Sequence, residues 1–110
     1  MKASKIAIKE AYKSTFKHRM GAVICKSGRV LSTGYNMVGH KSSIREFASI
    51  HAEEMAIMKL LNKPNGLQLL CGATIYVTRI MKNSTCGLAK PCPKCQDLIN
   101  SVGIKKVIHT

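Results

Sequence analysis

Two cysteines three positions apart are the first residues in this sequence that suggest chemistry. Cys92 and Cys95 lie in the stretch AKPCPKCQ, where Pro91 and Pro93 suit the first turn of a helix. Cysteines at positions i and i+3 of a helix share one face, and a helix start favours thiolate over thiol. The pair is compatible with a redox dithiol, half of a structural zinc knuckle, or part of an open metal site.

A metal site needs further ligands, and His51 in the stretch IHAEE is the best candidate. His51 also stands at a predicted helix start, so two helix N-termini would converge on one cation. Structural zinc sites are normally closed by four protein ligands, whereas catalytic sites leave one position for water. Glu53 lies two residues after His51, and a carboxylate that is not a ligand can move the proton of that water. Glu53 therefore favours the open, catalytic type of site.

The redox alternative is weaker because of what precedes the cysteines. A thioredoxin-like dithiol follows a strand, whereas a polar connection over residues 81–90 comes before Cys92. Cys86 in that connection is an alternative fourth zinc ligand, but the stretch CGLAKP offers no tight ligand turn. Cys25 and Cys71 have apolar neighbours, and we interpret them as packing residues.

The elements that must position these residues alternate between helices and strands. Patterns of apolar residues, caps and turn formers predict helices over residues 4–17, 50–63 and 91–103, a hairpin over 21–35, a long loop over 36–49, and strands over 72–80 and 104–110. This order indicates an α/β sandwich around a mixed sheet. The near-continuous apolar run in AVIC, residues 22–25, predicts an interior strand covered on both faces. The length of 110 residues indicates one domain, residues 1–110.

The net charge of +13 is the most unusual property of the composition. Such a surface attracts phosphorylated small molecules and polynucleotides. The first predicted helix, which Ser4 would cap, carries lysines at 5, 9, 13 and 17, either as a solvated face or as a phosphate-binding stripe. With 5% aromatic residues, the chain has few platforms for stacking bases.

Location follows from the cysteines and from apolar patterning. Five cysteines without the spacing of a small secreted scaffold indicate a reducing, intracellular setting, with the cytoplasm as the expected location. The sequence contains no run of about 18 apolar residues, so it predicts no membrane-spanning helix. The stretch MKASKIAIKE lacks the apolar core of a signal peptide.

The pattern H-A-E…P-C-x-x-C, formed by His51, Glu53, Cys92 and Cys95, matches the signature of the zinc deaminases. HRMGAVICKSGRVLSTGYN, HAEEMAI, GATIYVT and KPCPKCQDLINSVGIKKV follow in the order found in the cytidine and deoxycytidylate deaminase superfamily, which the chain resembles over nearly its whole length. STGYN, HAEE and GIKKV are most similar to the deoxycytidylate deaminase branch. The tRNA adenosine deaminases look similar but typically have Glu directly before PC, where this chain has Lys90.

This resemblance implies a cytidine deaminase-like three-layer α/β/α sandwich. Its mixed sheet would have about four strands with helices on both faces, and the chain would end at the fourth strand. His51, Cys92 and Cys95 would bind one Zn²⁺ per chain, with a water or hydroxide as fourth ligand. Glu53 would shuttle protons, Asn36 would contact the sugar of the substrate, and the backbone of Ala52 would bind the pyrimidine.

The activity implied by the resemblance is hydrolytic deamination of a cytosine-bearing nucleotide, dCMP or CMP, to its uracil form with release of ammonia. One alternative is deamination of cytosine or adenine in single-stranded DNA or RNA. Another is an inactive, zinc-stabilised module that binds nucleic acid. The expected partners are a pyrimidine nucleotide, a single-stranded nucleic acid held by the basic surface, and further copies of this chain, because the last strand would be an exposed edge.

A basic rim around the zinc site would suit a nucleotide phosphate, with solvated surface charge as the alternative interpretation of each residue. The candidates are Lys41, Arg45, Arg79, Lys82 and Lys90. Lys90, directly before the cysteine motif, is the one that we add to Asn36 and Ala52 as a substrate-binding residue.

Overall fold

A computed structural model describes residues 3–38 and 49–110 of the chain. The elements in chain order are α1 (Ala3–Ala11), β1 (Arg19–Lys26), β2 (Arg29–Tyr35), β3 (Met37–Val38), β4 (Ser49–Ile50), α2 (Ala52–Leu61), α3 (Gly66–Leu70), β5 (Thr74–Ile80), β6 (Cys86–Gly87), α4 (Pro93–Ser101) and β7 (Lys106–His109). The described helices include none with the length and apolar character needed to cross a bilayer.

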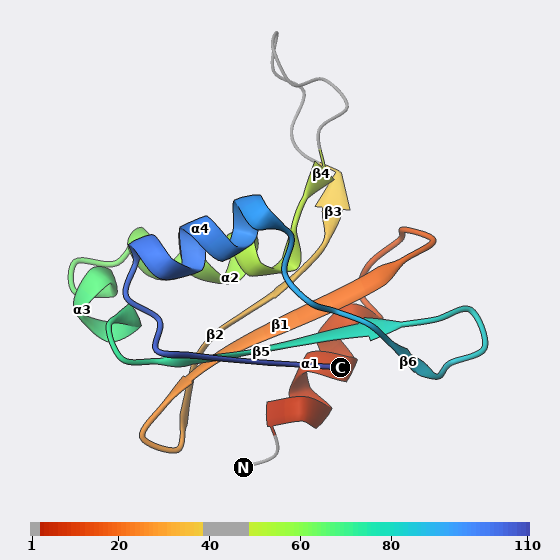
Figure 1. The fold of residues 1–110 in the computed structure, drawn as a ribbon, viewed down its shortest axis with the longest axis horizontal. Coiled ribbons are helices and arrows are strands. Elements are labelled where there is room, and N and C mark those ends of the chain that lie inside the picture. Colours follow the sequence, from red (N-terminus) through yellow and green to blue (C-terminus); the bar gives the residue numbers. More distant parts are fainter. Residues whose placement is uncertain (1–2, 39–48) are drawn as a thin grey trace, which may run out of the picture.

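The main sheet is mixed and has five strands (Figure 1). Strands β2, β1 and β5 are antiparallel neighbours. The other edge of β5 pairs in parallel with β7 along residues 74–77 and antiparallel with β6 at residues 79 and 80. The predicted number of about four strands did not include β6, because two residues carry no periodic signal.

Helices cover both faces of this sheet, which confirms the predicted three-layer sandwich (Figure 1). On β1, Val23 and Cys25 pack against α1, whereas Ala22 and Ile24 belong to the larger core under α2 and α4. Because successive side chains of a strand point to opposite faces, both sets must be apolar. The AVIC run therefore marks an interior strand, as its continuous apolarity predicted.

Two glycines let helices approach the sheet closely. A Cβ on Gly21 would lie 2.0 Å from the carbonyl oxygen of Ala7 in α1, and a Cβ on Gly34 would lie 2.4 Å from that of Ala52 in α2. Both distances are far below van der Waals contact, so a side chain at either position would push the helix away. Gly34 in particular allows the first turn of α2, which follows His51, to lie directly on β2.

The first helix is shorter than predicted. It ends at Ala11 rather than at residue 17, because the chain turns there, with the amide of Phe16 donating to Ser14 Oγ (3.2 Å), and β1 begins at Arg19. The prediction of a lysine stripe along one helix is therefore wrong, since Lys13 and Lys17 lie beyond the helix. Ser4 lies within the helix rather than at its cap.

The remaining differences concern short elements. The stretch predicted as one long loop contains β3 and the first residue of β4, which pair antiparallel with each other, and α3 begins at Gly66, the last residue of the predicted helix stop over 62–66. Each of these elements has five residues or fewer, too few for a periodic pattern. The candidate basic residues Lys41 and Arg45 lie outside the described residues.

Candidate metal centre and adjoining cavities

Three side chains that are distant in the sequence come together as a candidate metal site. The ligand atoms of His51, Cys92 and Cys95 all lie within 4.8 Å of one another, and no other cluster of this kind occurs in residues 3–38 and 49–110. Nδ1 of His51 lies 3.2 Å from Sγ of Cys95 and 3.7 Å from Sγ of Cys92. One imidazole nitrogen and two sulfurs are donors that zinc prefers, and three protein ligands leave one tetrahedral position open.

Two helix starts position these ligands. His51 is the N-cap of α2, and Cys92 is the N-cap of α4, whose first turn holds Cys95. The backbone N–H of His51 donates to Oε1 of Glu54 (3.2 Å), and Oε2 of Glu54 lies 3.6 Å from Nζ of Lys94, so an ion pair links the two first turns. Both N-termini direct their partial positive charge toward the cluster, a field that favours thiolate and opposes the larger effect of burial, which raises the pKa of the Cys95 thiol.

Two buried acidic groups belong to this region, Cys95 within the cluster and Glu53 beside it. Glu53 is 2% exposed, and burial raises the pKa of its carboxyl group above the ordinary value. Cys95 is 0% exposed, and burial, followed by the neighbouring Glu53, raises the pKa of its thiol strongly. No lysine or arginine among the described residues forms an ion pair with Glu53. A divalent cation fits this donor set, because its charge would compensate the thiolates of Cys92 and Cys95.

A cavity of about 360 Å³ adjoins the cluster, and we call it the site cavity. His51, Ala52 and Asn36 are among its lining residues. The structure therefore brings Asn36 and Ala52, two of the predicted substrate-binding residues, beside the candidate zinc-binding side chain of His51. Asn36 is held by the start of β1, because its Oδ1 accepts from the backbone N–H of Met20 (2.8 Å) and its Nδ2 donates to the carbonyl of His18 (2.7 Å). Volumes of this size suit a small organic ligand.

The sequence interpretation missed the wall to which Asn36 is bonded, which is formed by the segment between α1 and β1 and by the start of β1. The segment contributes Phe16, Lys17 and His18 to the site cavity, and β1 contributes Met20. The Nη2 of Arg79 in β5 lies 2.7 Å from Nδ1 of His18. Arginine only donates, so this nitrogen of His18 accepts and a neutral ring carries its proton on Nε2. A contact between residues so far apart in sequence has no local signal that could have predicted it.

Other predicted residues lie elsewhere. Lys90 is exposed and does not line the site cavity, so the structure does not place it with Asn36 and Ala52. Cys86 is exposed on β6 and is not part of the cluster. Cys25 is buried against α1, but Cys71 is exposed at the end of α3, so its interpretation as a packing residue is wrong. Its apolar neighbours in sequence face the core, while the helix end turns Cys71 outward.

Comparisons with known proteins agree with this geometry. The family described as "Cytidine and deoxycytidylate deaminase zinc-binding region" matches residues 1–110. A deoxycytidylate deaminase of Mycobacterium phage D29 is 28% identical over 115 residues, covering 84% of this chain and 78% of that protein. An uncharacterized deaminase of Aliivibrio fischeri is 35% identical over 98 residues, covering 81% of this chain and 56% of that protein.

Among solved structures, the apo dCMP deaminase of cyanophage S-TIM5 has the same fold. It superposes with a TM-score of 0.76 at 24% sequence identity and covers 97% of this chain and 78% of its own.

Proposed function

The chain belongs to the cytidine and deoxycytidylate deaminase zinc-binding family, a family of hydrolytic deaminases, and on that premise we propose a specific reaction for it. The reaction is the zinc-dependent conversion of a cytosine-bearing nucleotide, dCMP or CMP, to its uracil form with release of ammonia. The observation that carries this proposal is the buried Glu53 beside a cluster of three ligands that leaves one position open.

The residues divide the work as follows. His51, Cys92 and Cys95 would hold one zinc ion, which would supply the Lewis acidity that makes water nucleophilic near neutral pH. Glu53 takes a proton from the water that attacks C4 of the pyrimidine. It passes this proton to N3, then takes the second proton from the hydroxyl now bonded to C4 and passes it to the amino group. The C4–N bond breaks as the C4=O bond forms, and ammonia leaves. A raised pKa suits this double role, because an acid–base catalyst works best when its pKa is near the operating pH.

The site cavity orients the substrate. The backbone of Ala52, at the first position of α2, binds the pyrimidine, and Asn36 contacts the sugar. The two backbone hydrogen bonds of Asn36 hold its amide in one orientation, which reduces the entropy lost when the sugar binds.

The alternative of an inactive, zinc-stabilised binding module is less well supported. A structural zinc site has no use for a buried carboxylate outside its ligand set, and burial of Glu53 costs stability unless a cation or a proton compensates it.

Ammonia release from dCMP, CMP and cytidine tests the proposal. We expect zinc-loaded wild-type protein to deaminate at least one of them, and Glu53→Gln to lower kcat by about 10²–10⁴ while zinc content stays unchanged. Asp97→Asn is the matched control, because it removes the same charge from an exposed position of α4. Wild-type protein without activity on any of the three, or a Glu53→Gln variant as active as wild type, would contradict the proposal.

A further inference from the structure

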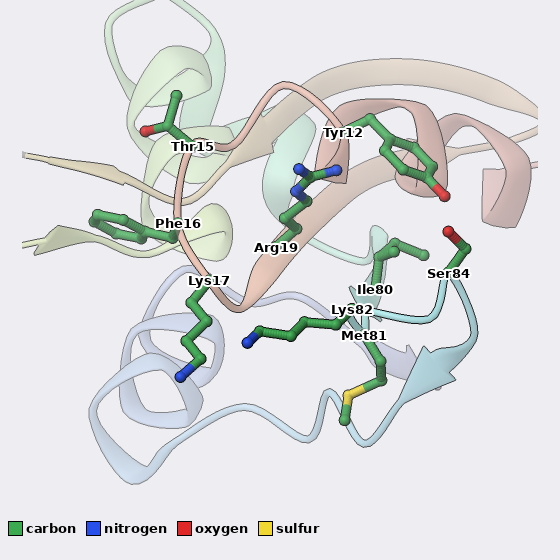
Figure 2. A pocket seen from close by; sticks show the side chains of 9 residues that line it. All are labelled: Tyr12, Thr15, Phe16, Lys17, Arg19, Ile80, Met81, Lys82 and Ser84. Carbon is green, nitrogen blue, oxygen red and sulfur yellow. The ribbon is translucent and has the colours of Figure 1, made fainter.

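A second, larger cavity lies beside the site cavity, between the segment after α1 and the turn that follows β5 (Figure 2). Its volume is about 440 Å³, and we call it the basic cavity. Three of its lining residues are cationic, namely Lys17, Arg19 and Lys82, and none is acidic. Figure 2 shows the amino groups of Lys17 and Lys82 pointing toward the same space.

No carboxylate compensates these charges within the described part of the chain. The ion pairs found there are Lys13–Glu10 and Lys94–Glu54, which involve none of the three cations. The guanidinium of Arg19 lies 5.7 Å from the ring centroid of Tyr12, a cation–π contact that leaves its charge in place. Like charges that face one another repel, so an anion between them would be attracted by both.

The two cavities adjoin each other. Phe16 and Lys17 line both of them, and a smaller cavity of about 210 Å³ is lined by Lys17, His18, Met81 and Lys82. Arg79 lies next to this smaller cavity through its contact with His18, and its Nε is buried without a hydrogen-bond acceptor. A buried donor without a partner calls for an acceptor such as an ordered water or an anion. Lys17 therefore places positive charge where the two cavities meet.

We propose that the basic cavity binds phosphate groups of a single-stranded polynucleotide whose target base occupies the site cavity. This inference rests on the proposed function, and it extends the substrate from a free nucleotide to a base within a strand. Each of the two larger cavities alone reaches the size of a small-molecule site, about 300–1,000 Å³, so one can receive a base while the other receives phosphate groups.

The aromatic residues of the basic cavity fit the same ligand. Tyr12 and Phe16 lie on opposite sides of Arg19 in Figure 2, and Tyr12 is 47% exposed. Grooves that bind single strands combine cations that follow the phosphates with aromatic rings on which bases stack. The cavity holds both, although the chain as a whole has few aromatic residues. Tyr12 lines only the basic cavity, so a mononucleotide in the site cavity would meet the ring of Phe16 but not that of Tyr12, and a free phosphate would use neither ring.

Fluorescence anisotropy of labelled 12-nucleotide oligo(dT) and oligo(U) with the zinc-loaded, full-length chain tests the inference. These strands contain no cytosine, so their binding does not depend on deamination. We expect Lys17→Ala/Lys82→Ala to weaken binding at least about tenfold at low salt, and to reduce the slope of log K against log salt by about 1.4, since each phosphate contact on a single strand contributes about 0.7. The affinity for oligo(dT) compared with that for oligo(U) shows whether the cavity prefers the phosphodiesters of DNA or those of RNA.

Lys105→Ala/Lys106→Ala is the matched control, because it removes two exposed charges at the opposite end of β5, where Lys106 pairs with Thr74. Thermal melting establishes that both variants are folded. Equal losses in the two variants would show that only the overall charge matters, and this result would overturn the inference, as would wild-type affinity in the Lys17/Lys82 variant.

Ammonia release from a cytosine-containing strand and from dCMP, measured on the same samples, separates the two proposals. If dCMP is deaminated but the Lys17/Lys82 variant binds strands as wild type does, the inference fails and the proposed function stands. If the variant loses binding but the wild-type protein releases ammonia from no substrate, the proposed function fails and the phosphate site remains.

Discussion

The candidate metal centre and the basic cavity are built from different parts of the fold. The candidate ligands of the metal centre lie at the starts of two helices that pack on the sheet, and both the ligand Cys95 and the neighbouring Glu53 are buried. The basic cavity takes its cations from exposed positions around the connections, with Lys17 before β1 and Lys82 after β5. In this chain, the residues proposed for catalysis lie at the starts of helices. The cations proposed to bind phosphate lie in or beside the loops that join the helices and strands.

This difference predicts how each region responds to change. Removing a buried ligand leaves unpaired groups inside the protein and should cost both folding stability and activity. Removing an exposed charge should change binding and its salt dependence while the fold stays intact. Three measurements test this contrast, and each can contradict it.

The largest effect is expected at a metal ligand. Cys95→Ala should abolish stoichiometric zinc binding and lower the free energy of unfolding by on the order of 4 kcal/mol, because the binding energy of a site-forming metal is also folding energy. Metal analysis and urea titration measure both quantities.

Cys86→Ala is the control for this substitution, since it removes an exposed thiol outside the cluster and should change neither quantity. A Cys95→Ala protein that keeps its zinc would show that these side chains are not the ligands.

An intermediate effect is expected from Glu53 in metal-free protein. Its folded-state pKa is raised above the ordinary 4.5, so the folded state binds the proton more tightly than the unfolded state. Ionisation of the buried Glu53 therefore lowers the free energy of unfolding. This loss is absent below the ordinary pKa, grows as pH rises through it, and levels off above the folded-state pKa. Metal-free Glu53→Gln should therefore exceed metal-free wild type in stability at pH 8 but not at pH 4. Chemical unfolding at both pH values measures this difference, and parallel pH profiles for the two proteins would contradict it.

The smallest effect is expected at the rim of the metal centre. The ion pair between Lys94 and Glu54 has an N–O distance of 3.6 Å, and the Lys94 side chain is 61% exposed. Exposed pairs of this kind contribute less than about 1 kcal/mol, so Lys94→Ala should change stability by no more than about 0.5 kcal/mol. Urea titration at low and high salt checks this value. A loss above about 2 kcal/mol would mean that the rim is as integral to the fold as the buried ligands.

The predictions from sequence succeeded where residue types repeat with the period of an element. The AVIC run predicted a central strand, and the alternation of helices and strands predicted the layers, because backbone geometry imposes these periods wherever a core must be covered. They failed where an element is too short to show a period, as for β6 and α3, and where a helix ends early, as after Ala11. Lysine spacing alone predicted a stripe that the turn after Ala11 removes.

For the site, the sequence by itself determined the types of ligand and the elements that carry them, since His51 and the two cysteines stand at recognisable helix starts. Only the tertiary structure decided what surrounds them. The contact between His18 and Arg79, the small cavity shared by Lys17 and Lys82, and the outward position of Lys90 depend on which connections the packed layers bring together. Local patterns encode local backbone geometry, whereas contacts between distant connections follow from the packing of the whole sheet and its helices.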